Sequence, residues 1–367
     1  MRRPSLQQLE RRFDRLRQLQ NRIKLPAAKY FEAFGRRYPL PLRAKCAGSH
    51  NYIPQRALEF LAGFFDGDGC VTCRMNRSGC ELSVTQSHFG VGVLLLFRNL
   101  LGGGVYLEKA AVGMQKPALR WAIAGEGGRH AARLLSSTGC CKRHELRIAS
   151  SWPQDHSARL AAALELRRLK DSPPTARCPS WSYLAGLFDA EGCISLRAPQ
   201  YIHLSLDQKS LGVLLAVKTF LHESQIPCTL PTSSRRKCHS LRINSTGVSR
   251  LALRKLISAG LRVKRRSAQV VLQMSRANFH EVRSSLQGLV GNQGMYQRLS
   301  RSGIERALEI RSIWRRLKAT AGDRQRELPI QKQLDSLKRQ HEYKCAEEKC
   351  LLIRQNVRSL LLARDAA

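Results

Sequence analysis

The sequence predicts an α+β fold with internal pseudo-two-fold symmetry, in which a unit of order αββαββα occurs twice. The nonamer LAGFFDGDG at residues 61–69 returns as LAGLFDAEG at 184–192, with six identical positions. Apolar residues recur at helical and strand spacings in the same order after each copy. Three polar residues also recur at a constant offset of 122, namely Gln86 with Gln208, Arg120 with Arg242, and Lys142 with Lys264. A repeat of about 122 residues therefore joins two similar halves.

The repeat divides the chain into five expected segments. Helical extensions flank the two halves, and the stretch DSPPTARCPS is rich in proline, as linkers often are. The segments are a basic helical extension (1–50), the first half (51–170), a linker (171–180), the second half (181–290) and a helical C-terminal extension (291–367).

In the first half, a helix begins after Pro54 and ends in the nonamer. Two strands follow within 69–86, around turn residues at 76–79. Apolar spacing through Val93, Leu94, Phe97 and Leu101 predicts a helix that is ended by three glycines at 102–104. Strands at 105–108 and 118–124 and a helix at about 130–137 complete this half.

The second half repeats this order. The helix that carries LAGLFDAEG is followed by strands at 193–198 and 201–208, a helix at about 211–221, a strand at 237–244 and a helix at 248–259. Beyond residue 290, an amphipathic helix is expected at 303–319, and a pair of helices at 324–363.

The charge of the chain indicates an anionic partner. There are 63 Lys and Arg residues against 27 Asp and Glu, which gives a formal net charge of +36. Nucleic acid fits this excess, because neutralising phosphates releases counterions. No run of about 18 uncharged apolar residues occurs, so no membrane-spanning helix is expected. Cys70, Cys73 and Cys80 lie on predicted strands, where they are expected to be free thiols rather than a zinc site.

The nonamers suggest two helices that pack closely and end in carboxylates. Small residues near the start of each copy, Ala62 and Gly63, then Ala185 and Gly186, allow two backbones to approach each other. Each helix ends in an acid, Asp68 or Glu191, followed by a glycine that is expected to be left-handed. Two acids at adjacent negative helix ends repel each other, and a divalent cation would relieve this repulsion.

These paired nonamers resemble the signature helices of the LAGLIDADG family of homing endonucleases, in its single-chain form. The resemblance covers roughly residues 55–285. It implies that Asp68 and Glu191 bind the metals, while the other two acids, Asp66 and Asp189, accept local backbone N–H bonds. It also implies catalytic roles for Gln86 and Gln208 near the attacking water, and for Lys142 and Lys264 at the scissile phosphate.

The resemblance further implies a saddle of two antiparallel sheets that bind the DNA major groove. Alternation along each strand then selects one polar face. The first sheet would use Thr72, Arg74, Asn76, Glu81, Ser83, Thr85 and Arg120. The second would use Ser195, Arg197, Gln200, His203, Ser205 and Arg242, with Arg235, Arg236 and Lys237 at a loop that reaches phosphates.

The expected activity is site-specific, double-stranded DNA cleavage by metal-dependent phosphodiester hydrolysis, as in intron homing. Mg²⁺ or Mn²⁺ is the expected cofactor, and a long pseudo-palindromic or asymmetric DNA site is the expected partner of a monomeric protein. Two alternatives remain open: a splicing maturase that binds intron RNA with the same fold, and an inactive DNA-binding relative. The expected compartment is an organelle (chloroplast or mitochondrion) or the nucleus, and no membrane association is expected.

Overall fold

The computed structural model describes residues 3–45, 52–73, 79–138, 141–171, 178, 180–198, 200–231, 238–320 and 322–365. The chain forms two compact units. A central unit comprises Ala28–Lys109 and Pro117–Leu289, and a terminal unit comprises Met1–Ala27, Ala110–Lys116 and Val290–Ala367. Apart from residues 110–116 and Val290, which belong to the terminal unit, the two predicted halves lie in the central unit.

The first half follows the predicted order αββαββα, with extra elements before and after it. Three short strands precede it: β1 (Tyr30–Ala33), β2 (Arg36–Pro39) and β3 (Leu42–Lys45). The repeat itself consists of α2 (Gln55–Asp68), β4 (Gly69–Cys73), β5 (Cys80–Ser87), the 3-10 turn η1 (His88–Gly90), α3 (Val91–Leu101), β6 (Gly103–Lys109), β7 (Ala118–Ile123) and α4 (Gly125–Ser136). Two more helices follow, α5 (Arg143–Ser150) and α6 (His156–Asp171).

The second half has the same order with one strand fewer among the described residues. Its elements are α7 (Trp181–Glu191), β8 (Gly192–Arg197), β9 (Tyr201–Gln208), α8 (Leu211–Glu223), β10 (His239–Ile243), α9 (Thr246–Ser258), α10 (Arg265–Leu272) and α11 (Phe279–Leu289). The three strands expected in this half are present, and Thr229 forms an isolated bridge with Arg242 beside them.

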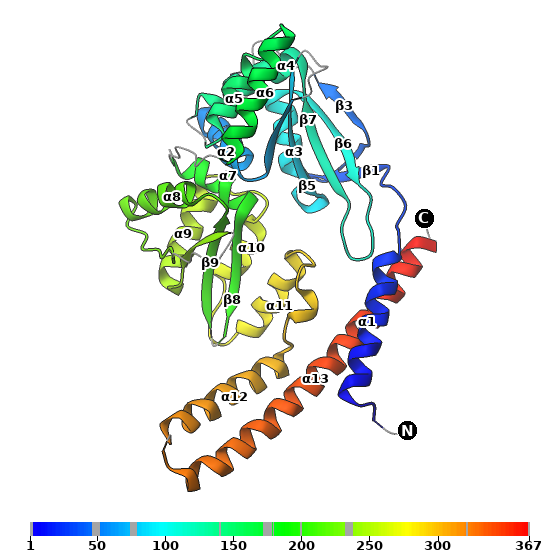
Figure 1. The fold of residues 1–367 in the computed structure, drawn as a ribbon, viewed down its shortest axis with the longest axis vertical. Helices are drawn as coiled ribbons and strands as arrows, with labels where there is room; N and C mark the ends of the chain where they lie inside the picture. Colours follow the sequence, from blue (N-terminus) through cyan, green and yellow to red (C-terminus); the bar gives the residue numbers. More distant parts are fainter. Residues whose placement is uncertain are drawn as a thin grey trace. The chain divides into compact units, whose positions relative to one another are not determined.

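Each half contains an antiparallel sheet, so the predicted α+β class is confirmed. The strand order is β3-β6-β7-β5-β4 in the first sheet and β10-β9-β8 in the second. Helices α2, α3 and α4 pack on the first sheet (Figure 1), against the side that carries Leu82, Val84 and Trp121. Alternation leaves the opposite side of each sheet polar, as the sequence pattern requires.

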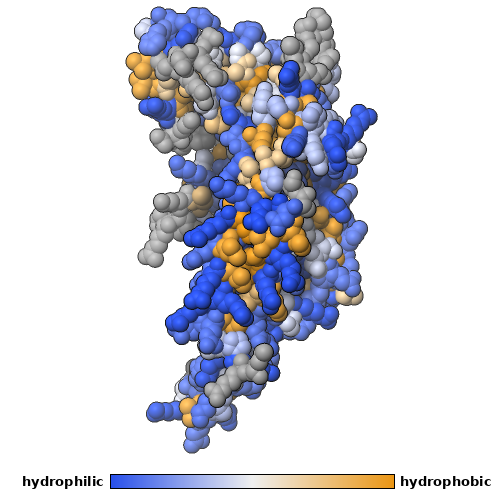
Figure 2. Space-filling view, turned by 90° about the vertical axis from the view of Figure 1, so that its right-hand side faces the viewer, coloured by the Kyte–Doolittle hydropathy of each residue, from blue (hydrophilic) through white to orange (hydrophobic). Residues whose placement is uncertain are grey.

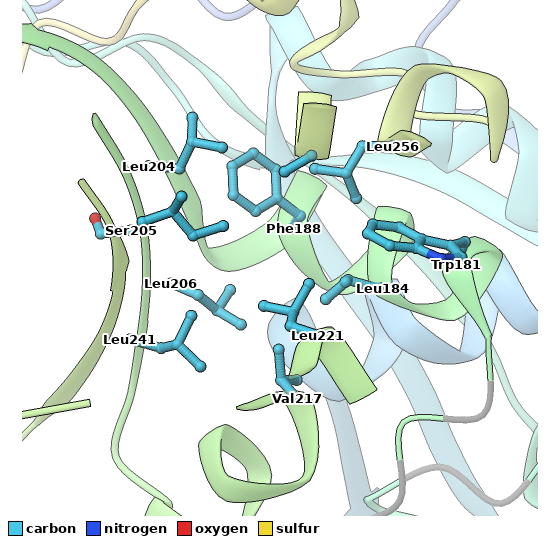
Figure 3. Close-up of a pocket in the computed structure, with 12 residues that line it drawn as sticks. Trp181, Leu184, Phe188, Leu204, Ser205, Leu206, Val217, Leu221, Leu241 and Leu256 are labelled. Atoms are coloured by element: carbon cyan, nitrogen blue, oxygen red, sulfur yellow. The ribbon is translucent and has the colours of Figure 1, made fainter. Parts of the chain in front are cut away.

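The cores of the two halves are filled differently. In the first half, the rings of Phe97 and Trp121 lie 4.8 Å apart between centroids, and both side chains are fully buried. The string GVLL at 92–95 returns at 212–215, which aligns Phe97 with Val217, and the offset of 122 aligns Trp121 with Ile243. These smaller residues help to line a small apolar cavity between α7, α8 and the sheet (Figure 3). The cavity belongs to the core, and the hydroxyl of Ser205 points away from it.

The terminal unit is built from helices at both ends of the chain. α1 (Leu6–Arg22) packs along α13 (Arg324–Asp365), which also packs against α12 (Arg301–Ala319), and the 3-10 turn η2 (Met295–Gln297) precedes α12. The segment 110–116 joins this unit, where the amide of Gly113 donates to the carbonyl of Ile23 over 2.8 Å. The buried cluster consists of Ile23, Tyr296, Ile353, Val357 and Leu360.

Three expectations about the extensions and the cysteines were wrong. Residues 1–50 are not helical throughout, because Tyr30–Lys45 forms strands and β3 pairs with β6. Residues 324–363 form one helix rather than two. Cys73 and Cys80 are not free thiols: they lie opposite each other in the β4–β5 register and form a disulfide.

Hydrophilic side chains cover most of the face shown in Figure 2, with apolar patches between them. Among the described helices, none has a stretch that is long and apolar enough to cross a membrane.

Candidate active site

The two nonamer helices, α2 and α7, pack directly against each other. Their contact requires glycine, because a Cβ on Gly63 would overlap the carbonyl oxygen of Tyr183, and a Cβ on Gly186 would overlap that of Phe60. Ala62 and Ala185 are fully buried beside them. The predicted close approach of the helices is therefore present.

The acids Asp68 and Glu191 are the last residues of α2 and α7. Both side chains are half-buried, and Gly67 beside Asp68 faces the side chain of Glu191: a Cβ there would lie 3.1 Å from Glu191 Cγ. The amide of Gln86 donates to Asp68, and that of Gln208 donates to Glu191 over 3.2 Å. The structure thus places each predicted glutamine, at the end of a second strand, against the acid of its own half.

Burial raises the pKa of both acids. The pKa of Asp68 is raised by desolvation, and this rise is opposed by Lys264, then by Lys142 and by the hydrogen bond from Gln86. The pKa of Glu191 is raised by desolvation and next by repulsion from Asp68, while Lys142 and then Lys264 lower it. Of the two lysines, the one from the other half favours the ionised form of each acid more. The two carboxylates, which repel each other, thus share the positive charges of Lys142 and Lys264.

The two lysines are held at the ends of the nonamer helices. Lys142 Nζ donates to the carbonyls of Phe65 (2.9 Å) and Gly69 (2.6 Å). Lys264 Nζ donates to the carbonyls of Asp189 and Ala190. The carbonyls at the end of each nonamer helix carry the negative end of its dipole, which favours an ammonium there. The Phe65 carbonyl also accepts the Gly69 amide, so Lys142 adds a second donor to it. Desolvation lowers the pKa of Lys264, and Asp189 and Asp68 oppose that shift.

The remaining acids of the nonamers, Asp66 and Asp189, are buried and accept backbone N–H bonds as expected. The donors are not local, however. Asp66 accepts from the amides of Cys141 and Lys142, and Asp189 accepts from those of residues 262–264. Each carboxylate therefore anchors the segment that carries the lysine of its own half. Burial raises the pKa of both acids against these hydrogen bonds.

The glycines that follow the acids do not have the left-handed conformation expected from the sequence. Gly69 has φ −76° and Gly192 has φ −73°, which any residue can adopt. Glycine is required for a different reason. A Cβ at Gly69 would collide with the ring and carbonyl oxygen of Phe65, and one at Gly192 would collide in the same way with Phe188.

The donor set at the helix ends fits a magnesium ion. Carboxylate oxygens are the protein ligands that Mg²⁺ prefers, and this ion commonly keeps several waters beside one or two carboxylates. Among the described residues, no group of three or more His, Cys, Asp or Glu side chains could hold a metal. Asp68 and Glu191 would thus be the protein ligands, with water and substrate oxygens as the others.

On the first sheet, those predicted DNA-binding residues that the structure describes share the polar face, but not all are accessible. Thr72 and Thr85 are exposed, whereas Ser83 is only 6 % exposed, so it offers little surface for a contact. Arg120 lies opposite Thr85 in the register and forms ion pairs with Glu81 and with Glu108 (3.5 Å). Arg74 and Asn76 lie outside the described residues.

On the second sheet, Arg197 is exposed, and Ser195 and Arg242 are half-buried on the same face. His203 and Ser205 are buried, at 4 % and 9 % exposure, so they are not open contact residues as predicted. His203 Nδ1 contacts Ser195 Oγ at 3.2 Å, whereas its Nε2 is buried without a partner in the described structure. Gln200 lies in the β8–β9 turn. Arg235, Arg236 and Lys237 fall outside the described residues.

Two features of the site were missed at the sequence level. The helix contact continues through Gly67 and Ala190, four residues after each interface glycine, and this spacing is visible in the sequence. Tyr183 of α7 donates its hydroxyl to Asp66 of α2. The sequence signal for this bond was a difference between the two copies: the residue before the nonamer is Tyr183, with a hydroxyl, in the second copy and Phe60, without one, in the first.

Residues 180–287 match the model of the LAGLIDADG-like domain family. The resemblance drawn from the paired nonamers is thereby confirmed for this part of the chain. No curated protein matches the sequence. Among solved structures, the chain is similar to a mutant of I-SmaMI, with 10 % identity over 65 % of this chain and 97 % of the other, at a TM-score of 0.46. It is also similar to the LAGLIDADG meganuclease I-AabMI bound to uncleaved DNA, with 14 % identity over 63 % and 97 % of the chains, at a TM-score of 0.47.

Proposed function

We propose that this protein is a metal-dependent endonuclease that hydrolyses one phosphodiester bond in each strand of double-stranded DNA. The observation that carries this proposal is the meeting of Asp68 and Glu191 at the ends of two packed helices, between Lys142 and Lys264. The net charge of +36 supports a nucleic acid substrate.

The site supplies one acid, one glutamine and one lysine for each strand. Gln86 and Gln208 each donate an amide hydrogen to an acid, which fixes the orientation of its carboxylate. Their carbonyl oxygens can accept a hydrogen bond from the attacking water. Lys142 and Lys264 bring positive charge to the phosphate, where charge develops in the transition state. The pKa of each metal-binding acid is lowered more by the lysine of the other half than by its own, so each centre would combine residues from both halves.

Asp68 and Glu191 would hold Mg²⁺ or Mn²⁺, which would polarise the phosphate and lower the pKa of bound water. A carboxylate pair supplied by one chain needs no second copy, so the protein acts as a monomer. The polar faces of the two sheets bind the DNA, and exposed side chains such as Arg197 read bases along a long site.

The test is cleavage of a randomised duplex library by the full chain with Mg²⁺. The wild-type protein should select and cut a discrete set of sites, and excess chelator should stop cutting. Asp68→Asn and Glu191→Gln should abolish cleavage and leave duplex binding intact, since phosphate neutralisation supplies most of the binding energy.

Glu126→Gln is the matched control, because it removes an acid that is 86 % exposed on α4. It should cut at the wild-type rate. Wild-type rates in Asp68→Asn or Glu191→Gln would exclude the proposed site. If structured intron RNA displaces every duplex and no duplex is cut, the maturase alternative replaces the nuclease.

A further inference from the structure

The two buried aspartates of the nonamer helices are satisfied in different ways. Asp189 accepts three backbone amides from its own half, those of Arg262 (2.6 Å), Val263 (3.1 Å) and Lys264 (2.8 Å). Among the described residues, Asp66 accepts the amides of Cys141 (2.5 Å) and Lys142 (2.9 Å); the counterpart of Arg262, Cys140, lies outside the described residues. Asp66 also accepts the hydroxyl of Tyr183, which comes from the other half.

The asymmetry follows from one position of the repeat. Tyr183 precedes the second nonamer, and its counterpart Phe60 has no hydroxyl to donate. Tyr183 is fully buried, and Asp66 is 7 % exposed, so neither group can exchange its partner for bulk water. A buried carboxylate that loses a donor pays the cost of an unsatisfied charge.

The bond matters because Asp66 anchors the segment that carries Lys142. The same carboxylate oxygen accepts both the Tyr183 hydroxyl and the Cys141 amide, and the Cys141 thiol lies 3.1 Å from that hydroxyl. The other oxygen holds the Lys142 amide. The Lys142 ammonium then reaches the end of α2 at the carbonyls of Phe65 and Gly69. Within the described part of the chain, the corresponding anchor of Lys264, Asp189, receives backbone amides and no side chain from the opposite helix.

We propose that Tyr183 is a positioning residue that places Lys142 through Asp66, so that only one of the two centres depends on a hydrogen bond across the helix interface. One consequence of this inference rests on the proposed nuclease function: loss of the Tyr183 hydroxyl should slow the cleavage of one strand more than that of the other. Its structural content, the selective anchoring of one lysine segment, holds independently of that function.

The first experiment is hydrogen exchange of backbone amides in the full chain, comparing wild type with Tyr183→Phe. The ring remains, so packing is conserved and only the hydroxyl is lost. The Cys141 and Lys142 amides should exchange at least tenfold faster, whereas those of Arg262, Val263 and Lys264 should not change. The second group is a control within the same molecule, because general loosening of the helix interface would raise exchange in both segments.

The second experiment follows each strand separately. The probe is a duplex recovered from the library with the wild-type protein, labelled at the end of one strand or the other. In Tyr183→Phe, cleavage of one strand should slow about tenfold while the other keeps its rate, so that a nicked duplex accumulates. A role confined to stability would slow both strands together.

The proposal would be overturned if Tyr183→Phe changed amide exchange equally in the two segments, or slowed the cleavage of both strands equally. If the wild-type protein cuts no duplex, the nuclease function fails. The exchange measurement would then still decide whether Tyr183 anchors the Lys142 segment.

Discussion

Gly63 lies directly against the backbone of Tyr183, with no room for a side chain between them. A Cβ on Gly63 would overlap the Tyr183 carbonyl oxygen and lie 2.8 Å from its carbonyl carbon. The mirror contact, Gly186 against Phe60, is equally tight. Backbone atoms form both contacts, so a neighbouring rotamer change cannot relieve a clash.

We therefore expect Gly63→Ala to destabilise the protein by about 1–3 kcal/mol, the usual range for overpacking. The free energy of unfolding in urea is the measurement. Gly247→Ala is the control, because that glycine lies in the first turn of α9 with no atom within 4 Å of its Cβ position. It should be neutral or stabilising. A loss as large in Gly247→Ala would show that packing between the helices is not the cause.

The acid pair should cost stability when no metal is present. Burial raises the pKa values of Asp68 and Glu191, so the folded protein binds their protons more tightly than the unfolded chain. This tighter proton binding contributes fully to the stability of the folded state at pH values below the pKa values of the two acids in the unfolded chain. The contribution is lost as the pH rises through their pKa values in the folded protein. At neutral pH, Asp68→Asn should therefore raise the melting temperature in chelator.

The same variant should gain little from Mg²⁺, while the wild-type melting temperature should rise with it. The advantage of Asp68→Asn in chelator should also shrink below about pH 4, where ordinary carboxylates are protonated. A lower melting temperature for Asp68→Asn at neutral pH would mean that the ionised acid stabilises the fold.

The cavity in the second half predicts different effects on the free energy of unfolding at the two equivalent positions. Phe97→Val should lower the free energy of unfolding by about 2–4 kcal/mol, because it empties a filled core. Val217→Leu adds one methylene beside the cavity and should be neutral or raise stability by up to about 1 kcal/mol. Urea unfolding of both variants is the measurement. Destabilisation by Val217→Leu beyond 1 kcal/mol would show that the space cannot accept a side chain.

Much of the central unit was predictable because its signals are local and occur twice. The nonamers define the packed helices, and the constant offset of Gln86, Arg120 and Lys142 to their counterparts marks which strand ends and loops match. Alternation identified the polar face of each sheet. It could not say that Ser83 and Ser205 are buried on that face, since their accessibility depends on neighbouring strands.

What failed at the sequence level depends on contacts between distant residues. β3 is a strand because it pairs with β6, about 60 residues later, and its own sequence carries no strong strand pattern. The glycines after the acids were explained by the wrong cause, because a steric demand by Phe65 or Phe188 cannot be distinguished from a left-handed cap without coordinates. The bond from Tyr183 to Asp66 crosses between the halves, so the sequence difference between Tyr183 and Phe60 does not by itself name the acceptor.

Base specificity and chemistry should separate between Arg197 and Lys264. Arg197 is exposed at the end of β8, on the polar face of its sheet, whereas the Lys264 ammonium is held at the end of α7. Losing one bidentate base contact costs about 1–3 kcal/mol of discrimination and affects one position of the site. A contact with phosphate carries no base information, so its loss slows cutting at all sites alike. Cleavage profiles over a library of single substitutions in the selected site distinguish the two effects. Arg197→Ala should flatten the preference at one position, and Lys264→Met should lower every rate while conserving the profile. If Lys264→Met changes the profile and Arg197→Ala does not, the two residues have the opposite roles.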